Sequence, residues 1–357
     1  MEQSPRQLRF LIAAGGTAGH VLPALAIADA LRARGANVTF AGSPDRVEAR
    51  LVPDAGYEFD AFRISGFPRK LGLRFVRALG RAATAPAACA AIIRRRRPDA
   101  VLGGGGYVAG PMVLAASLLR IPTALTEADA HFGLANRLAA PFARRVYLAY
   151  PVEGRTTSRY NVVGRAIPER SRSIATAEAR AFFGLPAEGP VVLIAGAMAG
   201  AHALNEFAVE TFGADGPAVL HITGDRDFDE VAASVSRPGY VVVPTTDRPG
   251  AAYSAADLVI ARAGSSVWEV AAAGKPAIFV PYPYATADHQ AKNAEHFVRA
   301  GGAVMVREAQ LSEVGDRAKE LLADPSRLTT MAAAMLAAAR PDAADVIAEG
   351  LIALVRS

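Results

Sequence analysis

The sequence predicts an α/β protein made of two doubly wound, Rossmann-like domains that face each other across a cleft. Three observations support this. The chain has 357 residues, more than the ~250–300 that one hydrophobic core usually serves. Apolar, β-rich runs alternate with helical stretches from end to end, as in parallel sheets covered on both faces. With 52% hydrophobic and 20% charged residues, the composition favours large packed cores over disorder.

The first half of the chain shows the βαβ rhythm most clearly. Six runs have the composition of buried strands, at residues 8–14, 37–41, 58–64, 100–102, 123–126 and 146–149. Three stretches between them have helical periodicity, at residues 22–34, 74–96 and 111–119. We therefore place an N-terminal domain at residues 1–165.

The same rhythm resumes after Pro168. Predicted strands lie at residues 191–195, 219–223, 240–243, 258–261, 277–280 and 303–306. Predicted helices lie at residues 178–183, 203–212, 229–236, 266–273, 290–300 and 313–322, with two final helices at 328–339 and 343–355. We assign residues 166–340 to the C-terminal domain and expect the last helix, within 341–357, to pack back on the first domain.

Composition also bears on the compartment and the partners. Cys89 is the single cysteine, which excludes an intrachain disulfide and favours a reducing compartment. From the polar start of the chain we expect no signal peptide, and no run has the length of a membrane span. The formal net charge of +5 suggests an anionic partner: nucleic acid, anionic lipid or an anionic small molecule.

One segment concentrates positive charge beside apolar residues. Its cations have no acid between them: Arg69, Lys70, Arg74, Arg77 and Arg81. They alternate with apolar side chains that include Leu73 and Phe75. This pattern predicts an interfacial helix on anionic lipid, each cation contributing about 1 kcal/mol; the alternative is a core-facing helix with solvated arginines. No nucleic-acid module is evident, so no nucleic-acid partner is expected.

Two glycine-rich loops follow predicted strands of the first domain. Residues 15–20 read Gly-Gly-Thr-Ala-Gly-His, and residues 103–106 are four consecutive glycines. Small residues let a ligand approach the backbone, and the helix start after the first loop presents free N–H groups to a phosphate. Neither loop has the spacing of a dinucleotide or P-loop motif. A tight turn or a crowded interdomain contact would be the structural alternative.

Two segments of the second domain suit a nucleotide sugar. Residues 262–269 run from Arg262 through a glycine and two serines to Glu269. A serine could cap the following helix beside an anion, and Glu269 could accept hydrogen bonds from a ribose. Residues 288–290, with Asn293, offer polar groups for sugar hydroxyls. The alternatives are an ordinary capped helix and an ordinary helix start.

With these segments in order, the chain resembles the MurG family of glycosyltransferases over most of its length. Residues 15–20 and 103–111 look like the family's two glycine-rich loops, and residues 262–274 with 281–294 look like its donor-binding stretch. The resemblance implies a GT-B fold and an inverting transfer of N-acetylglucosamine from UDP-N-acetylglucosamine (UDP-GlcNAc). The acceptor would be the 4-hydroxyl of the muramyl sugar of lipid I, giving lipid II. It also implies peripheral attachment to the cytoplasmic face of the plasma membrane, near other cell-wall enzymes.

The resemblance further implies roles for individual residues. The residues expected to bind the donor are Arg262, Gly264, Ser265, Ser266, Glu269, Gln290, Thr246 and Met198. Those expected to bind the acceptor or its diphosphate are Thr17, Ala18, Gly19, Gly105, Tyr107 and Arg165. The expected membrane contacts are Arg69, Lys70, Leu73, Arg74, Phe75 and Arg77.

An inverting displacement needs a base for the acceptor hydroxyl and stabilisation of the departing UDP. His20 is the candidate base, because neutral imidazole is poised near neutral pH; alternatively it orients the acceptor. Asp129 and Glu127 are alternative bases. Arg262 and the helix start beside it would stabilise the diphosphate. Asp225 and Asp227 have the spacing of a metal-binding motif of another glycosyltransferase fold, but here we expect no metal and no cofactor.

The chain also departs from the family pattern. Residues 126–129 read Thr-Glu-Ala-Asp where the family has His-Glu-Gln-Asn, and Met198 replaces a serine of the diphosphate loop. Residues 164–168 differ as well, and residues 262–269 are one residue shorter than usual. Three alternatives therefore stay open: another lipid or small-molecule acceptor, a UDP-sugar 2-epimerase, and a non-catalytic UDP-sugar-binding protein.

Overall fold

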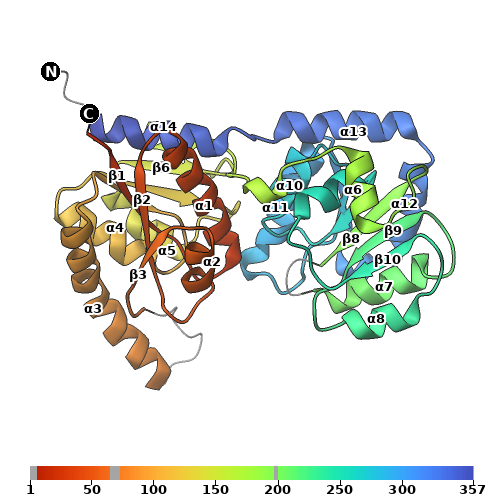
Figure 1. The fold of residues 1–357 in the computed structure, drawn as a ribbon, viewed down its shortest axis with the longest axis horizontal. Coiled ribbons are helices and arrows are strands. Elements are labelled where there is room, and N and C mark those ends of the chain that lie inside the picture. Colours follow the sequence, from red (N-terminus) through yellow and green to blue (C-terminus); the bar gives the residue numbers. More distant parts are fainter. Residues whose placement is uncertain (1–5, 65–72, 197–199, 357) are drawn as a thin grey trace. The chain divides into compact units, whose positions relative to one another are not determined.

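The computed structural model describes residues 6–64, 73–196 and 200–356, and it divides the chain into two compact units (Figure 1). Unit 1 comprises Met1–Pro168 with Pro341–Ser357, and unit 2 comprises Glu169–Arg340. The first boundary falls at Pro168, where the sequence placed it at residue 165. Within the described residues, no helix combines the length and apolar character needed to cross a membrane.

Unit 1 is built on a parallel sheet with the order β3-β2-β1-β4-β5-β6-β7. The strands are β1 (Arg9–Ala13), β2 (Asn37–Gly42), β3 (Glu58–Ala61), β4 (Ala100–Gly103), β5 (Thr123–Glu127), β6 (Arg145–Leu148) and β7 (Tyr160–Val162). Their buried, β-branched and aromatic side chains suit a sheet that is covered on both faces. β1 and β4 pair directly, which makes them the point where the strand order reverses.

Helices cover both faces of this sheet because β1 sends alternate side chains to opposite sides. Phe10 and Ile12 pack in the cluster that contains residues of α1 (Ala18–Ala33) and α14 (Ala343–Arg356). Leu11 and Ala13 pack in the cluster that contains residues of α3 (Leu73–Arg96) and α4 (Ala109–Leu118). The remaining helices of unit 1 are α2 (Glu48–Asp54), α5 (Leu134–Ala139) and the 3-10 turn η1 (Ala140–Phe142).

Unit 2 repeats this design with the order β10-β9-β8-β11-β12-β13. Its strands are β8 (Val191–Ala195), β9 (Ala218–Ile222), β10 (Tyr240–Val243), β11 (Leu258–Ala261), β12 (Ala277–Phe279) and β13 (Ala303–Met305). Its helices are α6 (Thr176–Phe183), α7 (His202–Phe212), α8 (Phe228–Ser234), α9 (Pro249–Ala255), α10 (Val267–Ala272), α11 (His289–Arg299), α12 (Glu313–Leu322) and α13 (Pro325–Ala338). Short 3-10 turns are η2 (Glu169–Ser171), η3 (Thr286–Asp288) and η4 (Glu308–Gln310).

The twelve predicted strands are all present, and the predicted doubly wound architecture of each half is confirmed. The sequence reading missed four short elements: β7, α2, α5 and α9. Each has only three to seven residues, too few for a periodic pattern to stand out. Ligands of open α/β sheets bind where the strand order reverses, which directs attention to the loops after β1, β4, β8 and β11.

Candidate functional site

The two glycine loops of unit 1 lie against each other at the point where the strand order reverses. The N–H of Gly15 donates to the carbonyl of Gly105 (3.4 Å), and that of Gly104 donates to Ala13 (2.8 Å). Gly106 has a φ of +74°, and a Cβ there would lie 2.1 Å from the carbonyl oxygen of Gly15. Only glycine fits this backbone-to-backbone approach. The run of glycines therefore has a structural reason, and it leaves the loop backbone close to any bound ligand.

A buried carboxylate that the sequence reading missed holds the first loop. Glu48, the first residue of α2, is fully buried. Its Oε2 accepts the N–H of Gly16 (3.0 Å), and its Oε1 accepts the N–H of Ser43 (3.1 Å). A Cβ on Gly15 would lie 2.2 Å from Glu48 Oε1. Glu48 thus positions the first glycine loop. No local sequence pattern predicts this contact, because it joins segments that are distant in the sequence.

His20 lies in the first turn of α1, directly after this loop. Its Nδ1 is 3.2 Å from the Oγ1 of Thr17, and Gly105 is packed so closely that a Cβ there would lie 2.5 Å from His20 Cδ2. Burial lowers the pKa of His20, and the charge of Arg165 lowers it further, whereas Asp129 acts in the opposite direction. The imidazole is therefore neutral at pH 7 and able to accept a proton.

Glu127 is the last residue of β5 and holds the loop that follows it, residues 128–133, which is the third loop of the site. Its carboxylate is buried, and Oε2 accepts hydrogen bonds from the N–H of Gly133 (2.9 Å) and the Nδ2 of Asn136 (2.9 Å). Oε1 accepts the N–H of Asp129 (3.2 Å). Burial raises the pKa of Glu127, against the lowering effect of these donors. With both oxygens engaged, Glu127 orients the loop that carries Asp129; a role as base stays a prediction.

Arg165 joins the first and third loops. Its guanidinium is buried and donates to the carbonyls of Gly19 and Ala128. A pocket of ≈ 320 Å³, counted to its open mouth, is lined by these residues together with His20 and Glu127. The structure therefore brings His20, Glu127, Asp129 and Arg165 into one neighbourhood, although they are separated by up to 145 positions in the sequence (165 − 20).

The other predicted acceptor-side residues surround this pocket. Ala18 is the first residue of α1, and Thr17 precedes it. Tyr107 lies against the first loop, where a Cβ on Gly16 would be 3.2 Å from its ring. The Tyr107 hydroxyl is buried and has no hydrogen-bond partner among the described residues. A buried, unpaired donor of this kind is unusual, and it suits a group that a ligand satisfies.

In unit 2, Arg262 follows β11 and is buried. Its guanidinium forms an ion pair with Glu308 and donates to the carbonyls of Val280 (3.3 Å) and Pro281 (3.4 Å). These partners were not foreseen. They fix the position of Arg262 beside the loop after β12. They also use much of the hydrogen-bonding capacity of the guanidinium, which the sequence analysis expected to bind the diphosphate.

The loop after β11 meets the start of α11. Gln290 Oε1 accepts the N–H of Tyr282 (2.9 Å), and its Nε2 lies 3.9 Å from where a Cβ of Gly264 would stand. Ser266 occupies the N-cap position of α10, next to Ser265, but its side chain makes no capping hydrogen bond. Of the two serines that could have capped this helix, Ser266 does not: its backbone is already helical, with a φ of −66°, whereas capping residues adopt an extended conformation.

Two further donor-side predictions have partners within unit 2. Glu269 Oε2 accepts the hydroxyls of Ser171 (2.8 Å) and Tyr253 (3.5 Å). Burial raises the pKa of Tyr253 well above 10, and the neighbouring Glu269 raises it further, so the phenol stays a donor. The Oγ1 of Thr246 accepts the N–H of Arg248 (3.0 Å).

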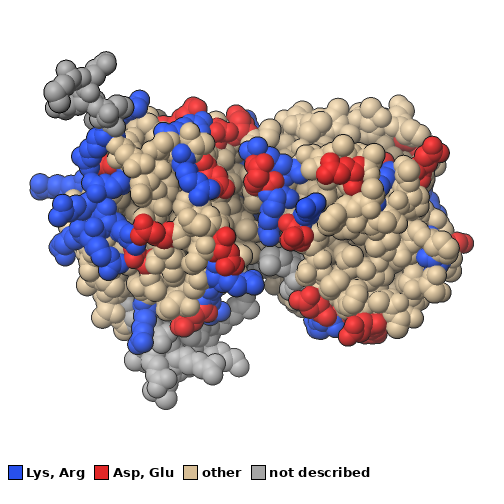
Figure 2. Space-filling model, in the orientation of Figure 1, with Lys and Arg blue, Asp and Glu red and all other residues tan. Residues whose placement is uncertain are grey.

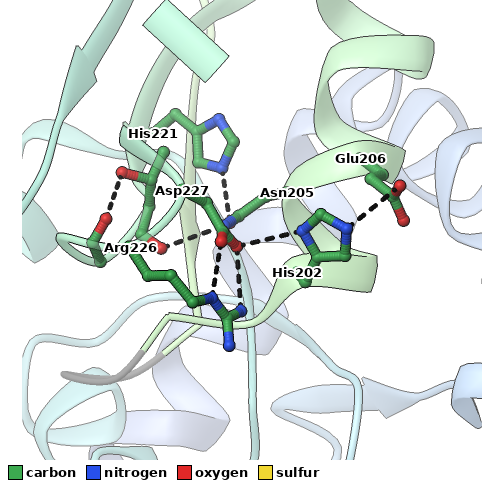
Figure 3. A network of polar contacts seen from close by, with 8 residues as sticks. His202, Asn205, Glu206, His221, Arg226 and Asp227 are labelled. Atoms are coloured by element: carbon green, nitrogen blue, oxygen red, sulfur yellow. Dashed lines mark hydrogen bonds and ion pairs between the residues drawn. The ribbon is translucent and has the colours of Figure 1, made fainter. Parts of the chain in front are cut away.

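A polar network ties the start of α7 to the loop after β9 (Figure 3). Asn205 Nδ2 donates to the carbonyl of Thr223 (3.0 Å) and to Asp227 Oδ2 (2.9 Å), so Asn205 Oδ1 is an acceptor. His221 Nε2, 3.0 Å from that oxygen, therefore carries the proton, and its Nδ1 accepts from the hydroxyl of Tyr240 (3.0 Å). Burial lowers the pKa of His221 to about 4, so the ring is neutral.

Asp227 is engaged by protein groups. Besides Asn205, it contacts the guanidinium of Arg226 (2.7 Å) and Nδ1 of His202 (3.3 Å). The hydrogen bond from Arg226 lowers its pKa to about 2. Among the described residues, no group of three or more His, Cys, Asp or Glu side chains is placed to hold a metal ion.

Some of the predicted residues fall outside the part of the chain that the structure describes. Met198, Arg69 and Lys70 lie outside the described residues. The expected membrane residues Leu73, Arg74, Phe75 and Arg77 belong to the first turns of α3, but their side chains also lie outside what the structure describes.

Comparisons with known proteins agree with this arrangement. The N-terminal domain model of glycosyltransferase family 28 matches residues 10–148, and the C-terminal domain model of that family matches residues 191–347. The chain is 42% identical to a protein of Acidithiobacillus ferrooxidans over 96% of both chains, and 40% identical to one of Rhodococcus opacus over 97% and 96%. Both relatives are named UDP-N-acetylglucosamine–N-acetylmuramyl-(pentapeptide) pyrophosphoryl-undecaprenol N-acetylglucosamine transferase.

Solved structures show the same fold. The crystal structure of Acinetobacter baumannii MurG matches 98% of this chain and 100% of its own, with a TM-score of 0.78 and 31% identity. A UDP-GlcNAc 2-epimerase from Neisseria meningitidis shares the fold with a TM-score of 0.66 but is only 13% identical. Both domain models match in order, and the identity to transferases extends over nearly the whole chain. The chain therefore belongs to glycosyltransferase family 28 and, within it, to the MurG enzymes.

Proposed function

We propose that this protein transfers N-acetylglucosamine from UDP-GlcNAc to the 4-hydroxyl of the muramyl sugar of lipid I, with inversion, giving lipid II. The observation that carries the proposal is the 40–42% identity, over 96–97% of the chain, to transferases whose names state this donor and acceptor. The site in unit 1 supports it, because loops after three neighbouring strands converge on a neutral imidazole.

On the acceptor side, His20 takes the proton of the attacking hydroxyl. The acceptor oxygen forms a bond to the anomeric carbon while the bond from that carbon to UDP breaks, and UDP leaves with the electron pair. A neutral His20 is required at the start of this step, and burial favours that form. Asp129, whose charge acts on His20, stabilises the imidazolium that forms. Arg165 and the glycine loops hold the acceptor or its diphosphate.

On the donor side, the loops after β11 and β12 supply the contacts. Gly264 and Gln290 are close together, so backbone and amide groups can reach the sugar and the nucleotide at one place. Glu269 accepts the hydroxyls of Ser171 and Tyr253 through Oε2, and in this proposal its other carboxylate oxygen accepts a ribose hydroxyl of the donor. Arg262 is paired with Glu308, which offsets its charge, so its proposed part is to shape the donor side of the site beside the departing diphosphate. No metal is required in this scheme.

The proposed acceptor also implies where the enzyme acts in the cell. Lipid I resides in the membrane, so the protein attaches peripherally to the cytoplasmic face, where UDP-GlcNAc is supplied and other cell-wall enzymes act. The basic, apolar segment that includes Arg69, Lys70 and Arg74 is one expected contact. Figure 2 shows Lys and Arg side chains gathered on the side of unit 1 where α3 ends, which favours an anionic surface there.

A second candidate keeps the chemistry and changes the acceptor. It is favoured by the divergent residues 126–129, because Glu127 lines the pocket around His20 and the charge of Asp129 acts on that imidazole. A 2-epimerase is less favoured, since its likeness to this chain is confined to the fold.

A transfer assay tests the proposal. The protein is incubated with radiolabelled UDP-GlcNAc and a lipid I analogue, and the lipid fraction is analysed for the disaccharide. Label in the lipid with a β-linkage to the muramyl 4-hydroxyl supports lipid II synthesis. UDP release only with other acceptors supports the second candidate. Conversion of UDP-GlcNAc to a 2-epimer, or donor binding without turnover, would overturn both.

A further inference from the structure

Two consecutive residues of opposite charge follow β13, and each forms an ion pair with a different element of the donor side of unit 2. Arg307 and Glu308 come two and three residues after the end of β13. The guanidinium of Arg307 contacts the carboxylate of Asp288 (3.0 Å), and the carboxylate of Glu308 contacts the guanidinium of Arg262. One turn of the chain therefore holds residues of two segments that the sequence analysis expected to bind the donor.

The sheet sets the position of this turn. β13 pairs with β12, with Met305 opposite Phe279, and the N–H of Val306 donates to the carbonyl of Phe279 (3.0 Å). The side chain of Val306 is buried. Arg307 and Glu308 therefore leave the sheet at a fixed place, beside the loop that follows β12. That loop, residues 280–288, is here called the β12 loop.

Glu308 acts on the start of the β12 loop through Arg262. The guanidinium of Arg262 is buried, and besides its ion pair with Glu308 it donates to the carbonyls of Val280 (3.3 Å) and Pro281 (3.4 Å). A buried charge is costly unless it is paired. Glu308 thus stabilises Arg262 in the position from which it holds the first two residues of the loop.

Arg307 acts on the end of the same loop. Its Nη1 donates to Oδ1 (3.1 Å) and Oδ2 (3.0 Å) of Asp288, and its Nη2 donates to Oδ2 (3.0 Å). Asp288 and the preceding Ala287 have φ values of +52° and +53°, in the left-handed region that is unfavourable for residues with a side chain. Such a conformation persists where its surroundings hold it. The bidentate ion pair with Arg307 is one contact that does so.

Gln290 depends on the position of the β12 loop. Its Oε1 accepts the N–H of Tyr282 (2.9 Å), and it follows Asp288 by two residues. The Nε2 of the same amide lies 3.9 Å from where a Cβ of Gly264 would stand. A shift of either end of the loop therefore moves the amide that lies beside Gly264.

We propose that Arg307 and Glu308 are positioning residues of the donor site, which fix the Gln290 amide by holding the β12 loop at both ends. Neither residue contacts the donor; they act through Asp288 and Arg262. The consequence for UDP-GlcNAc rests on the proposed function, whereas the holding of the loop does not.

Amide hydrogen exchange tests the holding of the loop without any substrate. Arg307→Gln removes the ion pair, and Asp288→Asn removes it from the other side while keeping a residue that tolerates a positive φ. Each variant should exchange the N–H of Tyr282 at least ~threefold faster than the wild type, because the loop opens more often. The matched control is Arg317→Gln, which breaks the exposed ion pair with Glu320 on α12 and should leave this exchange unchanged.

Titration calorimetry with UDP-GlcNAc and with UDP tests the role in the donor site. Arg307→Gln should weaken UDP-GlcNAc binding about three- to tenfold. It should change UDP binding less than twofold, because UDP lacks the sugar that the Gln290 amide is proposed to contact. Arg307→Lys keeps the charge but not the bidentate geometry, so it should restore part of the loss. The double variant Arg307→Gln/Asp288→Asn should lose no more than the larger single loss, since one ion pair is removed in each case.

Glu308→Gln tests the other end of the loop, because it leaves the buried guanidinium of Arg262 without its charged partner. UDP-GlcNAc affinity should fall at least ~tenfold. In transfer assays the KM for UDP-GlcNAc should rise in every variant that loses affinity, while kcat changes less than twofold, the pattern of lost uniform binding. Circular dichroism establishes that each variant is folded. If Glu308→Gln does not fold, the Arg307 variants still decide, since both side chains of their ion pair are 47% exposed.

Two results would overturn the positioning role. One is an Arg307→Gln protein that behaves like Arg317→Gln in hydrogen exchange or in UDP-GlcNAc binding. The other is an equal loss of affinity for UDP and UDP-GlcNAc, which would indicate general damage to unit 2. A wild-type protein that does not bind UDP-GlcNAc would instead refute the proposed function, and hydrogen exchange would still decide whether the ion pairs hold the loop.

Discussion

Replacing Gly105 by alanine should disable His20 without touching unit 2, where we propose that the donor binds. Gly105 has a φ of +103°, and an added Cβ would lie 2.5 Å from His20 Cδ2. That is roughly 1 Å closer than carbon atoms pack in protein interiors. The backbone conformation itself costs an alanine about 1–2 kcal/mol. Either the loop or the imidazole must therefore move by about 1 Å.

A displacement of that size at a reacting group costs about 10²-fold in rate, which corresponds to about 2.7 kcal/mol of activation free energy. Steady-state kinetics with UDP-GlcNAc and the lipid I analogue should show kcat reduced by about this factor. Affinity for UDP, measured by titration calorimetry, should stay unchanged, because the expected UDP contacts are in unit 2.

Two glycines of unit 1 serve as controls. Gly35 also has a positive φ (+79°), but nothing lies within 4 Å of an added Cβ, so Gly35→Ala carries the backbone strain without the clash. Gly110 lies in α4 with open space around it, and Gly110→Ala should stabilise the helix by roughly 1 kcal/mol. Activity of Gly105→Ala within threefold of these controls would refute the placement of His20 at the reacting centre.

Three further predictions concern groups inside the units. Glu48→Gln should destabilise unit 1 by about 1.5–3 kcal/mol, since an amide cannot accept both N–H groups; urea unfolding checks this against Glu58→Gln at an exposed position, and an equal effect of the two would contradict the role of Glu48. The pKa of His221 is lowered to about 4, so its contribution to the stability of unit 2 is complete above pH 6.5 and is lost as the pH falls from 6.5 towards 4, by roughly 3 kcal/mol. Unfolding midpoints at several pH values should show this decline, and His221→Gln should flatten it. Activity should survive excess chelator, because Asp227 is held by protein groups; a loss that Mg²⁺ restores would show that a metal is needed.

The sequence predicted the parts of this molecule that depend on local chemistry. The buried strands follow from apolar runs, and the glycine loops follow from a backbone that must pass close to its neighbours, as Gly106 does beside Gly15. His20 was proposed because it ends a glycine-rich loop that follows a strand, whereas Arg165 was proposed only from the family resemblance; both roles stay predictions. Such features depend on a few consecutive residues, so they can be predicted from local sequence.

Contacts between distant segments could not be predicted in the same way. Glu48 supports the first glycine loop from α2, and Glu308 takes the guanidinium of Arg262 from 46 positions away. No local pattern distinguishes these two carboxylates from ordinary surface acids. α5 was missed because six residues are too few for a periodic signal, yet its Asn136 donates to the Glu127 carboxylate. The contact between α5 and the end of β5 can be recognised only once the positions of the strands are known.

The pH dependence of kcat/KM tests most directly whether His20 is the base. Because burial lowers its pKa, the acid limb of the profile should fall below pH 6.5, and neutral His20 should sustain activity down to that limb. His20→Ala should lower kcat/KM by roughly 10²–10⁴-fold and abolish the acid limb. A loss smaller than tenfold, or an acid limb that persists unchanged in the variant, would contradict proton transfer to His20.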